Sequence, residues 1–300
     1  MKKSPFWLRS LLWVLAVFLM LAAVVYQRTT GPTYPARGEF ELAGEVYAYK
    51  LIRSDWSIKT NPAARVEIPD PGAQRLTRAE LVYRRLRTDD PFTHLEMTPQ
   101  SVDGKNLLVG ELPAQPAAGK LEYHLELATV EGEAVRVPAQ GEVIIRFKDH
   151  VPGWVLWPHV VMMFFSVLIG MRAGLGALFA PWRMRLWAWI ALVGMTIGGM
   201  CLGPLVQKYA FGAYWTGFPF GGDWTDNKML VMWLSWVVAC AAIGFRPKKR
   251  EFVSRGLVVA AGIAMTVAFL IPHSMGGSEL DYSKVDQGVD PAHAIETGRP

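Results

Sequence analysis

The segment that decides the fold is the apolar run Phe6–Tyr26, FWLRSLLWVLAVFLMLAAVVY, near the start of the chain. About 20 apolar residues of helix cross the roughly 30 Å hydrocarbon core of a bilayer, so this run is long enough to span a membrane. Four further apolar runs follow a long polar stretch, at residues 154–171, 186–206, 229–245 and 256–271. This order predicts a multi-pass α-helical membrane protein with five transmembrane helices and a polar domain inserted after the first.

The apolar runs divide the chain into four parts. We expect residues 1–30 to form an N-terminal transmembrane helix and residues 152–273 to form a four-helix bundle with an outer loop at 207–228. Residues 33–150 form the inserted domain, and residues 274–300 a C-terminal tail. The first run could be a cleaved signal peptide. Its length and the sequence LAAVVYQRTT, which lacks a small-x-small cleavage site, favour an uncleaved signal anchor.

Basic residues are concentrated in alternate connections of the predicted helices. They flank the first helix, the second-to-third connection and the fourth-to-fifth connection: Lys2, Lys3, Arg9, Arg172, Arg183, Arg185, Arg246, Lys248, Lys249, Arg250 and Arg255. The positive-inside rule assigns these residues to the cytoplasmic face. The inserted domain and the C-terminus are then periplasmic, in a bacterial inner membrane. The net charge of +5 comes largely from these anchors, so it does not indicate nucleic-acid binding.

The inserted domain shows the short alternating segments and intervening turns of a β protein. Segments such as EVYAYKLIRS, NLLVGELP and LEYHLELATV number about seven, which suits a β-sandwich. Two consecutive stretches of the domain are AELVYRRLRTDDPFTHLEMTPQ and LVGELPAQPAAGKLEYHLELATVEGEAVRVP. They resemble the late strands of immunoglobulin-like or fibronectin type III-like bacterial modules. The resemblance implies a module that binds partners or spaces domains and seldom catalyses.

The two cysteines and the histidines of the inserted domain do not indicate a reactive or metal-binding site. Cys201 and Cys240 both lie in predicted transmembrane helices, where we interpret them as small apolar residues. In the inserted domain His94, His124 and His150 are scattered and lack metal-ligand spacing. The sequence therefore predicts no metal site from these residues.

Two histidines lie near the outer ends of predicted transmembrane helices. His159 stands in WVLWPHVVMMFF, about 7–8 Å below the membrane surface at 1.5 Å per residue, and His273 in LIPHSMGGSELDY. Polar side chains are costly in a membrane, and imidazoles from two helices can ligate haem b or a metal ion. We hypothesise that His159 and His273 bind haem b. The structural alternative is an aromatic belt with Trp154 and Trp157, in which the imidazoles are merely solvated.

The outer loop is dense in aromatic residues and glycines, reading KYAFGAYWTGFPFGGDWTDNK from Lys208 to Lys228. Because it is too apolar to extend into water, we expect it to cover the outer end of the bundle near the two histidines. Its expected contacts with a ligand are Trp215, Phe220, Asp223 and Asp226. The alternative is a lid without a ligand, in which Thr225, Asp226 or Asn227 caps the next helix.

The membrane half contains three motifs: WPHVVMMF, GPLVQKYAFGAYWTGFPFGGDWTDNK and PHSMGGSELDY. With these motifs the chain resembles an uncharacterised family of bacterial inner-membrane proteins, in which the loop motifs occur together. The resemblance adds weight to the outer histidines and loop but implies no reaction. Nucleotide-binding, hydrolase, zinc-protease and c-type haem motifs do not occur in the sequence. Whether the chain is an enzyme stays open, and the sequence favours that it is not one on its own.

Three functions remain in view. The first is a membrane subunit of a redox complex, which holds haem b in the outer leaflet or packs on a haem- or quinone-containing partner subunit. The second is a non-catalytic membrane anchor whose sandwich binds a periplasmic partner protein. The third is a membrane-embedded metal enzyme. A coloured purified protein would distinguish the first from the second.

Overall fold

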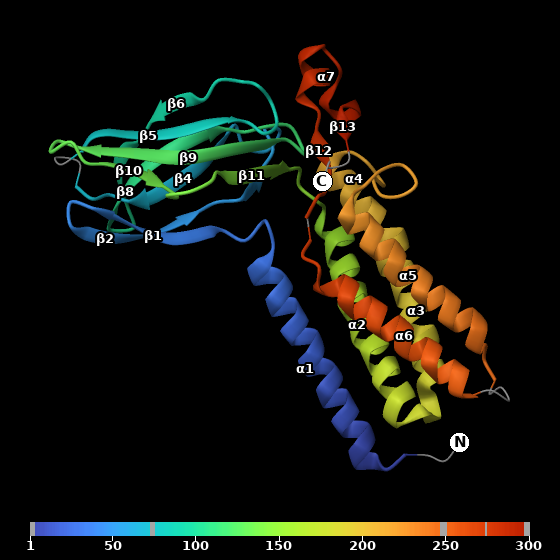
Figure 1. The fold of residues 1–300 in the computed structure, drawn as a ribbon. Helices are drawn as coiled ribbons and strands as arrows, with labels where there is room; N and C mark the ends of the chain where they lie inside the picture. The colour runs from blue at the N-terminus through green and yellow to red at the C-terminus, as the bar shows by residue number, and fades with distance from the viewer. Residues whose placement is uncertain (1–3, 73–75, 247–250, 274, 297–300) are drawn as a thin grey trace.

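The computed structural model describes residues 4–72, 76–246, 251–273 and 275–296. Within these residues five helical segments are long and apolar enough to cross a membrane: α1 (Phe6–Thr30), α2 (Gly153–Phe179), the continuous segment Pro181–Phe211, α5 (Trp224–Ile243) and α6 (Glu251–Leu270). Figure 1 shows the last four as a bundle, with α1 running along its side. All five predicted helices are therefore present, and each begins at or before the residue expected for it.

The bundle packs mainly through alanine and methionine side chains around one buried tryptophan. Its buried cluster includes Ala188, Met195, Trp236 and Met265. Where α2 crosses α6, a Cβ added at Gly262 would lie 3.3 Å from the Cα of Gly174, so glycine lets the two backbones approach closely. Of the cysteines, Cys240 is buried in this cluster and Cys201 is exposed.

The third helical segment changes its winding along its length. A short turn, η2 (Pro181–Arg183), leads into α3 (Met184–Met195), then the π-helical η3 (Thr196–Leu202) and α4 (Gly203–Phe211). A proline in a helix lacks an N–H and crowds the carbonyl four residues earlier, and the wider π turn before Pro204 relieves this crowding. The helix predicted over 186–206 is thus present, and its change of winding could not be predicted because apolarity reports a helix but not its winding.

The described residues of the inserted domain form eleven strands: β1 (Ala36–Leu42), β2 (Glu45–Leu51), β3 (Ser54–Trp56), β4 (Ala63–Pro69), β5 (Leu76–Arg85), β6 (Thr93–Glu96), β7 (Thr98–Val102), β8 (Lys105–Pro113), β9 (Lys120–Thr129), β10 (Ala134–Val137) and β11 (Val143–Lys148). One sheet has the order β3-β11-β9-β5-β6, with β10 also paired to β9, and another has the order β4-β8-β7. β1 and β2 form a hairpin.

The sheets enclose one apolar core, which confirms the β-sandwich. Alternate residues of β9, Tyr123, Leu125 and Leu127, are fully buried and meet Val66 of β4 and Leu108 of β8 in one cluster. The domain described by the structure contains no disulfide, so this core supplies its stability. β11 ends at Lys148, and only four residues connect it to α2, so the end of the sandwich lies close to the start of the bundle.

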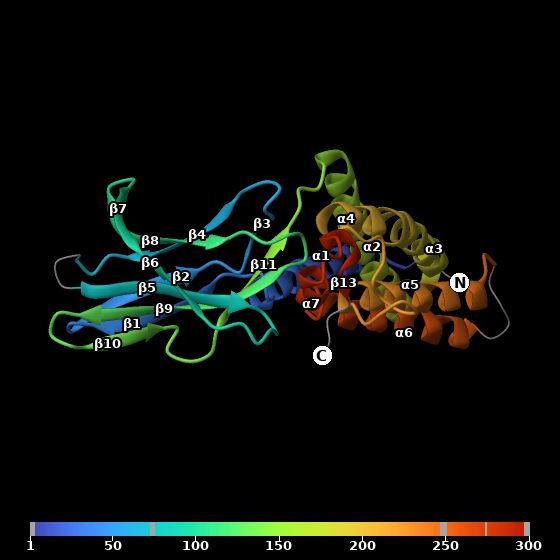
Figure 2. The same cartoon turned by 90° about the horizontal axis from the view of Figure 1, so that it is seen from above.

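The C-terminal segment is folded, where the sequence suggested only a tail. It forms β12 (Glu279–Leu280), α7 (Tyr282–Asp286), η4 (Pro291–His293) and β13 (Ile295–Glu296). These elements lie at the sandwich end of the bundle, as Figure 2 shows from above. The Leu280 N–H donates to the Ala118 carbonyl at 3.2 Å, and the Tyr282 hydroxyl donates to the Lys120 carbonyl at 2.9 Å. The tail therefore joins the sandwich to the bundle.

Candidate functional site

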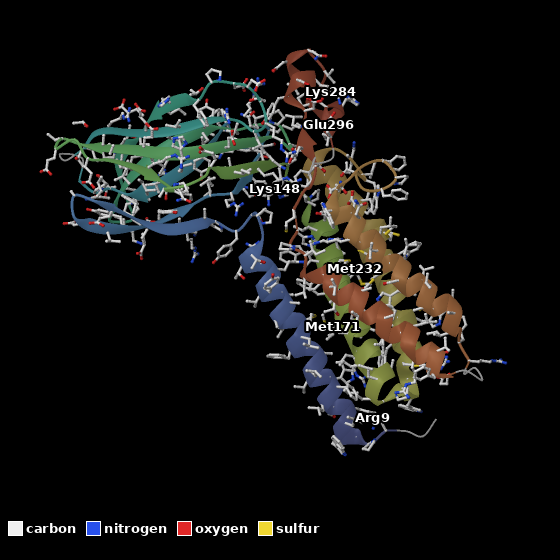
Figure 3. All side chains as sticks on the ribbon, viewed as in Figure 1. Arg9, Lys148, Met171, Met232, Lys284 and Glu296 are labelled. Carbon is white, nitrogen blue, oxygen red and sulfur yellow. The ribbon has the colours of Figure 1, made fainter. Side chains whose placement is uncertain are left out.

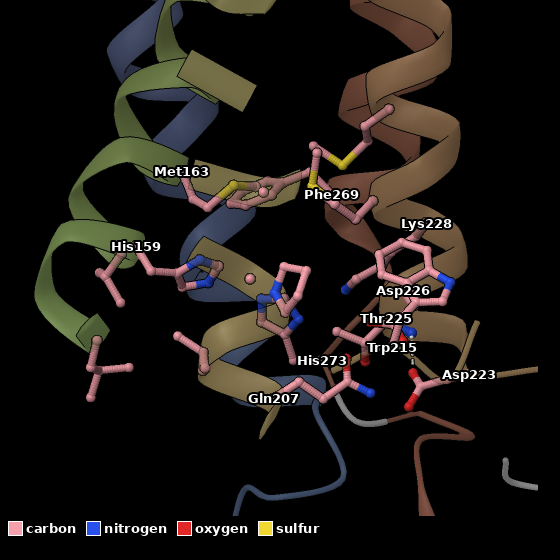
Figure 4. Close-up of a pocket in the computed structure, with 18 of the residues that line it drawn as sticks. His159, Met163, Gln207, Trp215, Asp223, Thr225, Asp226, Lys228, Phe269 and His273 are labelled. Carbon is pink, nitrogen blue, oxygen red and sulfur yellow. Dashed lines mark hydrogen bonds between the residues drawn. The ribbon is translucent and has the colours of Figure 1, made fainter. Parts of the chain in front are cut away.

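A cavity of about 370 Å³ lies at the sandwich end of the bundle, and we call it the sandwich-end cavity. Its walls are mostly apolar and come from α1, α2, the η3–α4 segment, α5 and α6: Leu156, Val160, Met163, Phe164, Met229, Met232 and Phe269 among others. His159 and His273 both line it, and Figure 4 shows their rings directed into the same space from different elements. The structure thus brings the two candidate histidines together.

His159 is held in one orientation by the π-helical turn. Its Nδ1 lies 2.8 Å from the carbonyl oxygen of Gly198, and a carbonyl can only accept a hydrogen bond. Nδ1 therefore carries the proton, which leaves the lone pair of Nε2 free. The same carbonyl also accepts the N–H of Gly203.

His273 lies just past the end of α6, two residues beyond Ile271. Its ring is accessible because it faces the cavity. The Ile271 carbonyl beside it accepts a hydrogen bond from Lys228 Nζ at 2.6 Å, and Gln27 of α1 donates to the Phe269 carbonyl at 2.6 Å. These two contacts fix the end of α6, and with it the start of the segment that carries His273.

Three of the four expected loop residues line the cavity. Trp215, Asp223 and Asp226 do so, whereas the Phe220 side chain is 81% exposed and does not. Phe220 lies at the tip of the turn in which its own N–H donates to the Gly217 carbonyl, and this turn directs the ring away from the bundle. Aromatic content alone could not separate Trp215 from Phe220, because both occur in the same apolar loop.

The two carboxylates hold the loop in place. Asp223 accepts hydrogen bonds from the Thr225 N–H at 2.7 Å, from the Thr216 hydroxyl at 3.0 Å and from the Ser278 N–H at 2.9 Å. Asp226 accepts from the Thr216 N–H at 2.6 Å. Asp223 therefore caps α5, where the sequence suggested Thr225, Asp226 or Asn227. With their oxygens so occupied, both aspartates act as supports of the cavity wall.

Two cations that sequence reasoning missed also line the cavity. Arg146 comes from β11 and is 7% exposed; its guanidinium lies 4.0 Å from the centre of the Phe211 ring and donates to the Ser278 carbonyl at 3.2 Å. Burial lowers the pKa of Arg146 to about 10, with Asp223 and Glu279 opposing the shift, so it stays charged at neutral pH. Lys228 is similarly buried at the start of α5. In the sequence Arg146 occurs in an ordinary alternating strand, which gave no signal of its place.

The site therefore combines apolar walls, two imidazoles and two cations. A cavity of this size with a few convergent polar groups is the usual form of a small-molecule site. One imidazole presents a free lone pair, and the cations suit a ligand with carboxylates or carbonyl oxygens. A flat, largely apolar molecule with a polar edge matches this lining.

A second cluster with metal-ligating side chains lies on the sandwich. Glu80, His94 and Glu126 bring one ligand atom each to within 4.8 Å of the others. The spacing rules missed it because the residues come from three neighbouring strands, β5, β6 and β9, whose register sets them side by side. Glu80 accepts a hydrogen bond from His94 at 2.7 Å and Glu126 pairs with Arg78 at 3.0 Å. We interpret the cluster as surface ion pairs.

Comparison with protein-family models and with curated proteins finds no match for this chain. Among solved structures it is similar to Astrotactin-2, described as a vertebrate-specific, perforin-like membrane protein involved in neuronal development. The identity is 8% and the TM-score 0.25, over 60% of this chain and 36% of that one. The chain thus spans about a third of the length of that structure, and a likeness this weak carries no argument about fold or function.

Proposed function

We propose that this protein is a membrane-embedded subunit of a redox complex and that its sandwich-end cavity holds haem b between His159 and His273. The observation that carries the proposal is the convergence of two imidazoles, one from α2 and one from the segment that follows α6, on one apolar cavity. Haem iron is commonly held by histidine, and ligating histidines usually donate their second nitrogen to a carbonyl or carboxylate. His159 has this arrangement through Gly198.

The other polar groups of the cavity suit the same ligand. Haem b carries two carboxylates, and Arg146 and Lys228 are buried cations that each have N–H groups to spare beyond the one hydrogen bond made to a carbonyl. Bound haem would supply one-electron transfer. The chain's own residues would orient the ring, exclude water and set the charge around it. Electron transfer would then run between a partner at the sandwich end and the membrane.

The membrane setting is part of the proposal. We infer that the five apolar helices cross a bacterial inner membrane with the N-terminus in the cytoplasm, because the basic residues gather at the end far from the sandwich. The sandwich, which we propose to be of the immunoglobulin-like or fibronectin type III-like kind, would then be periplasmic. It would dock partner subunits, and the tail would brace it against the bundle.

A quinone is the second candidate ligand, favoured by the size of the cavity. At about 370 Å³ the cavity is near the lower end of the range for small-molecule sites, and a quinone ring with its apolar tail in lipid needs less room than a porphyrin. His159 Nε2 could accept a proton from a quinol, and the Lys228 ammonium could donate to a quinone oxygen. Both candidate ligands would occupy the same cavity. Only haem b would use His273 as an iron ligand.

The test compares ligand content in three variants of the full-length protein purified in mild detergent. His159→Ala and His273→Ala should each lose the haem absorption of the wild type, because each removes one of the two iron ligands. The control is His150→Ala, which removes a histidine that lies beside Trp56, at 5.8 Å between ring centres, away from the cavity. It should keep full absorption.

Other outcomes separate the alternatives. If both single variants keep the haem, the proposed ligand pair is wrong. If the wild type is colourless and releases a quinone on solvent extraction, while His159→Ala releases none, the second candidate takes the place of the first. If the wild type is colourless and carries neither, the protein is better explained as an anchor for a periplasmic partner.

A further inference from the structure

A second cavity lies at the far end of the bundle, between the first turns of α1 and the connection from α2 to α3. Its volume is about 200 Å³, which is more than several water molecules occupy. Three arginines and three tryptophans dominate its lining: Arg9, Arg172, Arg183, Trp13, Trp182 and Trp187. We call it the arginine cavity. Figure 3 labels Arg9 at this end of α1, far from the sandwich.

Arg172 is the unusual member of the group. It precedes the last residue of α2 by seven positions, roughly 10 Å along the helix, and its side chain is only 4% exposed. Two of its nitrogens, Nε and Nη1, are buried without a hydrogen-bond partner among the described residues, and Arg9 Nε is in the same state. A buried guanidinium that lacks an acceptor is strongly unfavourable, so the arrangement points to a missing anion.

The backbone is shaped to admit the Arg172 side chain. One turn later in α2, a Cβ added at Gly176 would lie 2.9 Å from Arg172 Nη1. A side chain at this position would displace the end of the Arg172 side chain, so glycine lets the guanidinium lie against α2 at the edge of the cavity. Among the described lining residues none carries a carboxylate, so the protein offers no internal counterion at this place.

The tryptophans hold the guanidinium groups without satisfying their N–H donors. Arg172 lies 5.4 Å from the centre of the Trp13 ring, and Arg9 and Arg183 lie 5.8 Å and 4.4 Å from that of Trp182. Stacking on a ring face stabilises the cation but leaves its N–H groups pointing outward in the guanidinium plane. These donors are thereby oriented for an oxyanion with several acceptor oxygens.

We propose that the arginine cavity binds the phosphate of an anionic phospholipid headgroup from the leaflet at the far end of the bundle. Arginine's planar fork matches phosphate oxygens, and tryptophan is typical of the headgroup level of a bilayer. Phe6 of α1 lines the cavity and is strongly exposed, as are Leu11 and Val14 further along the helix, so α1 offers an apolar surface to the acyl chains of a lipid whose headgroup enters the cavity. Three cations favour an anionic headgroup over a zwitterionic one.

The experiment measures thermal stability and lipid retention of the full-length protein in detergent after removal of native lipid. Phosphatidylglycerol should raise the melting temperature of the wild type and stay bound in native mass spectrometry. Phosphatidylcholine and inorganic phosphate should do neither to the same degree, because the first is zwitterionic and the second lacks the acyl chains.

Variants locate the site. Arg172→Met and Arg183→Gln should each retain phosphatidylglycerol roughly fivefold less well, as expected for the loss of one cation near an anionic lipid. Arg183 is exposed, so its variant reports on the site even if Arg172→Met fails to fold. Arg246→Gln is the matched control, an exposed arginine that does not line the cavity, and should retain lipid as the wild type does.

Two results would overturn the proposal. One is equal retention of phosphatidylglycerol by the wild type, Arg172→Met and Arg183→Gln. The other is stabilisation of the wild type by inorganic phosphate as strong as that by phosphatidylglycerol, which would make the ligand a soluble phosphate. Neither result bears on the histidines at the opposite end of the bundle.

Discussion

At the scale of single residues, Asp223 and Arg146 tie three parts of the chain together. Arg146 comes from the sandwich, Asp223 caps α5, and Ser278 of the tail hydrogen-bonds to both. All three are buried. Buried polar groups are stable only when their partners are present, so each of these contacts depends on the other two parts being docked.

Asp223→Ala should destabilise the protein by about 2 to 4 kcal/mol, because it removes a helix cap and leaves the buried N–H of Ser278 without its acceptor. The measurement is the melting temperature of the full-length protein in detergent. Asp89→Ala, at an exposed position, is the control and should change stability by less than about 0.5 kcal/mol. An equal effect of the two substitutions would contradict the structural role of Asp223.

At the scale of elements, the π-helical η3 decides the geometry of the sandwich-end cavity. It presents the Gly198 carbonyl to His159 and packs closely on α2. A Cβ at Gly198 would lie 2.9 Å from the Met162 Cβ and 3.2 Å from the backbone carbonyl carbon of Met162. Since backbone cannot yield as a flexible side chain does, this contact requires glycine.

Gly198→Ala should therefore push η3 away from α2, lower the melting temperature and weaken retention of the cavity ligand. Gly256→Ala is the matched control, because a Cβ at that exposed position of α6 meets nothing within 4 Å. Alanine is the better helix former by about 1 kcal/mol, so the control should be neutral or slightly stabilising. If Gly198→Ala behaves like the control, close packing at η3 is not needed.

The folded tail is the other element with a measurable property. Arg85 of the sandwich pairs with Asp90 at 2.5 Å and with Asp286 of α7 at 2.7 Å, and these hydrogen bonds lower the pKa of both carboxyls. Hydrogen bonds from Ser283 lower the pKa of Asp281 to about 2. Carboxyls with a lowered pKa in the folded state stabilise it above their ordinary pKa and lose that effect as pH falls through the folded value.

The pair of Arg85 with Asp286, which joins α7 to the sandwich, should therefore hold the tail from neutral pH down to about 4, the ordinary pKa of a carboxyl, and weaken as the pH falls from there to about 2. Pepsin cleavage of the tail across this range measures the change. Arg85→Gln removes both pairs and should make the tail susceptible already at the upper end of the range. Release of the wild-type tail near pH 6 would mean that a histidine, and not these carboxyls, controls docking of the tail, and it would contradict this prediction.

The elements also show how much of the structure could be predicted from the sequence. Long apolar runs and alternating strands report burial directly, so the five helices and the sandwich could be predicted. β1 could not be predicted in this way, because its sequence ARGEFEL is mostly polar and the strand depends on pairing with β2. The depth of His159 and His273 suggested their shared cavity, but the approach of Arg146, the cap at Asp223 and the docking of the tail depend on contacts between segments far apart in sequence.

At the scale of the whole molecule, the basic far end and the sandwich end are chemically distinct. Figure 1 shows the sandwich and the C-terminal elements together at one end of the bundle and the N-terminus at the other. An odd number of spans requires this arrangement if all five helices cross the membrane. The two cavities would then serve opposite leaflets, one for a redox ligand and one for a lipid headgroup.

Labelling with a membrane-impermeant thiol reagent tests this topology. After replacement of Cys201 and Cys240 by serine, a cysteine at Glu131, an exposed turn of the sandwich, should react in intact spheroplasts. A cysteine at Arg246, between α5 and α6, should react only after lysis. Reaction of both positions in intact spheroplasts would mean that one of the five helices does not cross the membrane.

The reduced-minus-oxidised absorption spectrum of the wild-type protein, purified full length in mild detergent, tests the central claim most directly. We predict about one haem b per chain, with a spectrum that carbon monoxide leaves unchanged, because His159 and His273 would both hold the iron and leave it no site for a further ligand. A colourless protein, or a haem that binds carbon monoxide as freely as a five-coordinate one, would contradict the proposal that these two histidines ligate haem in the sandwich-end cavity.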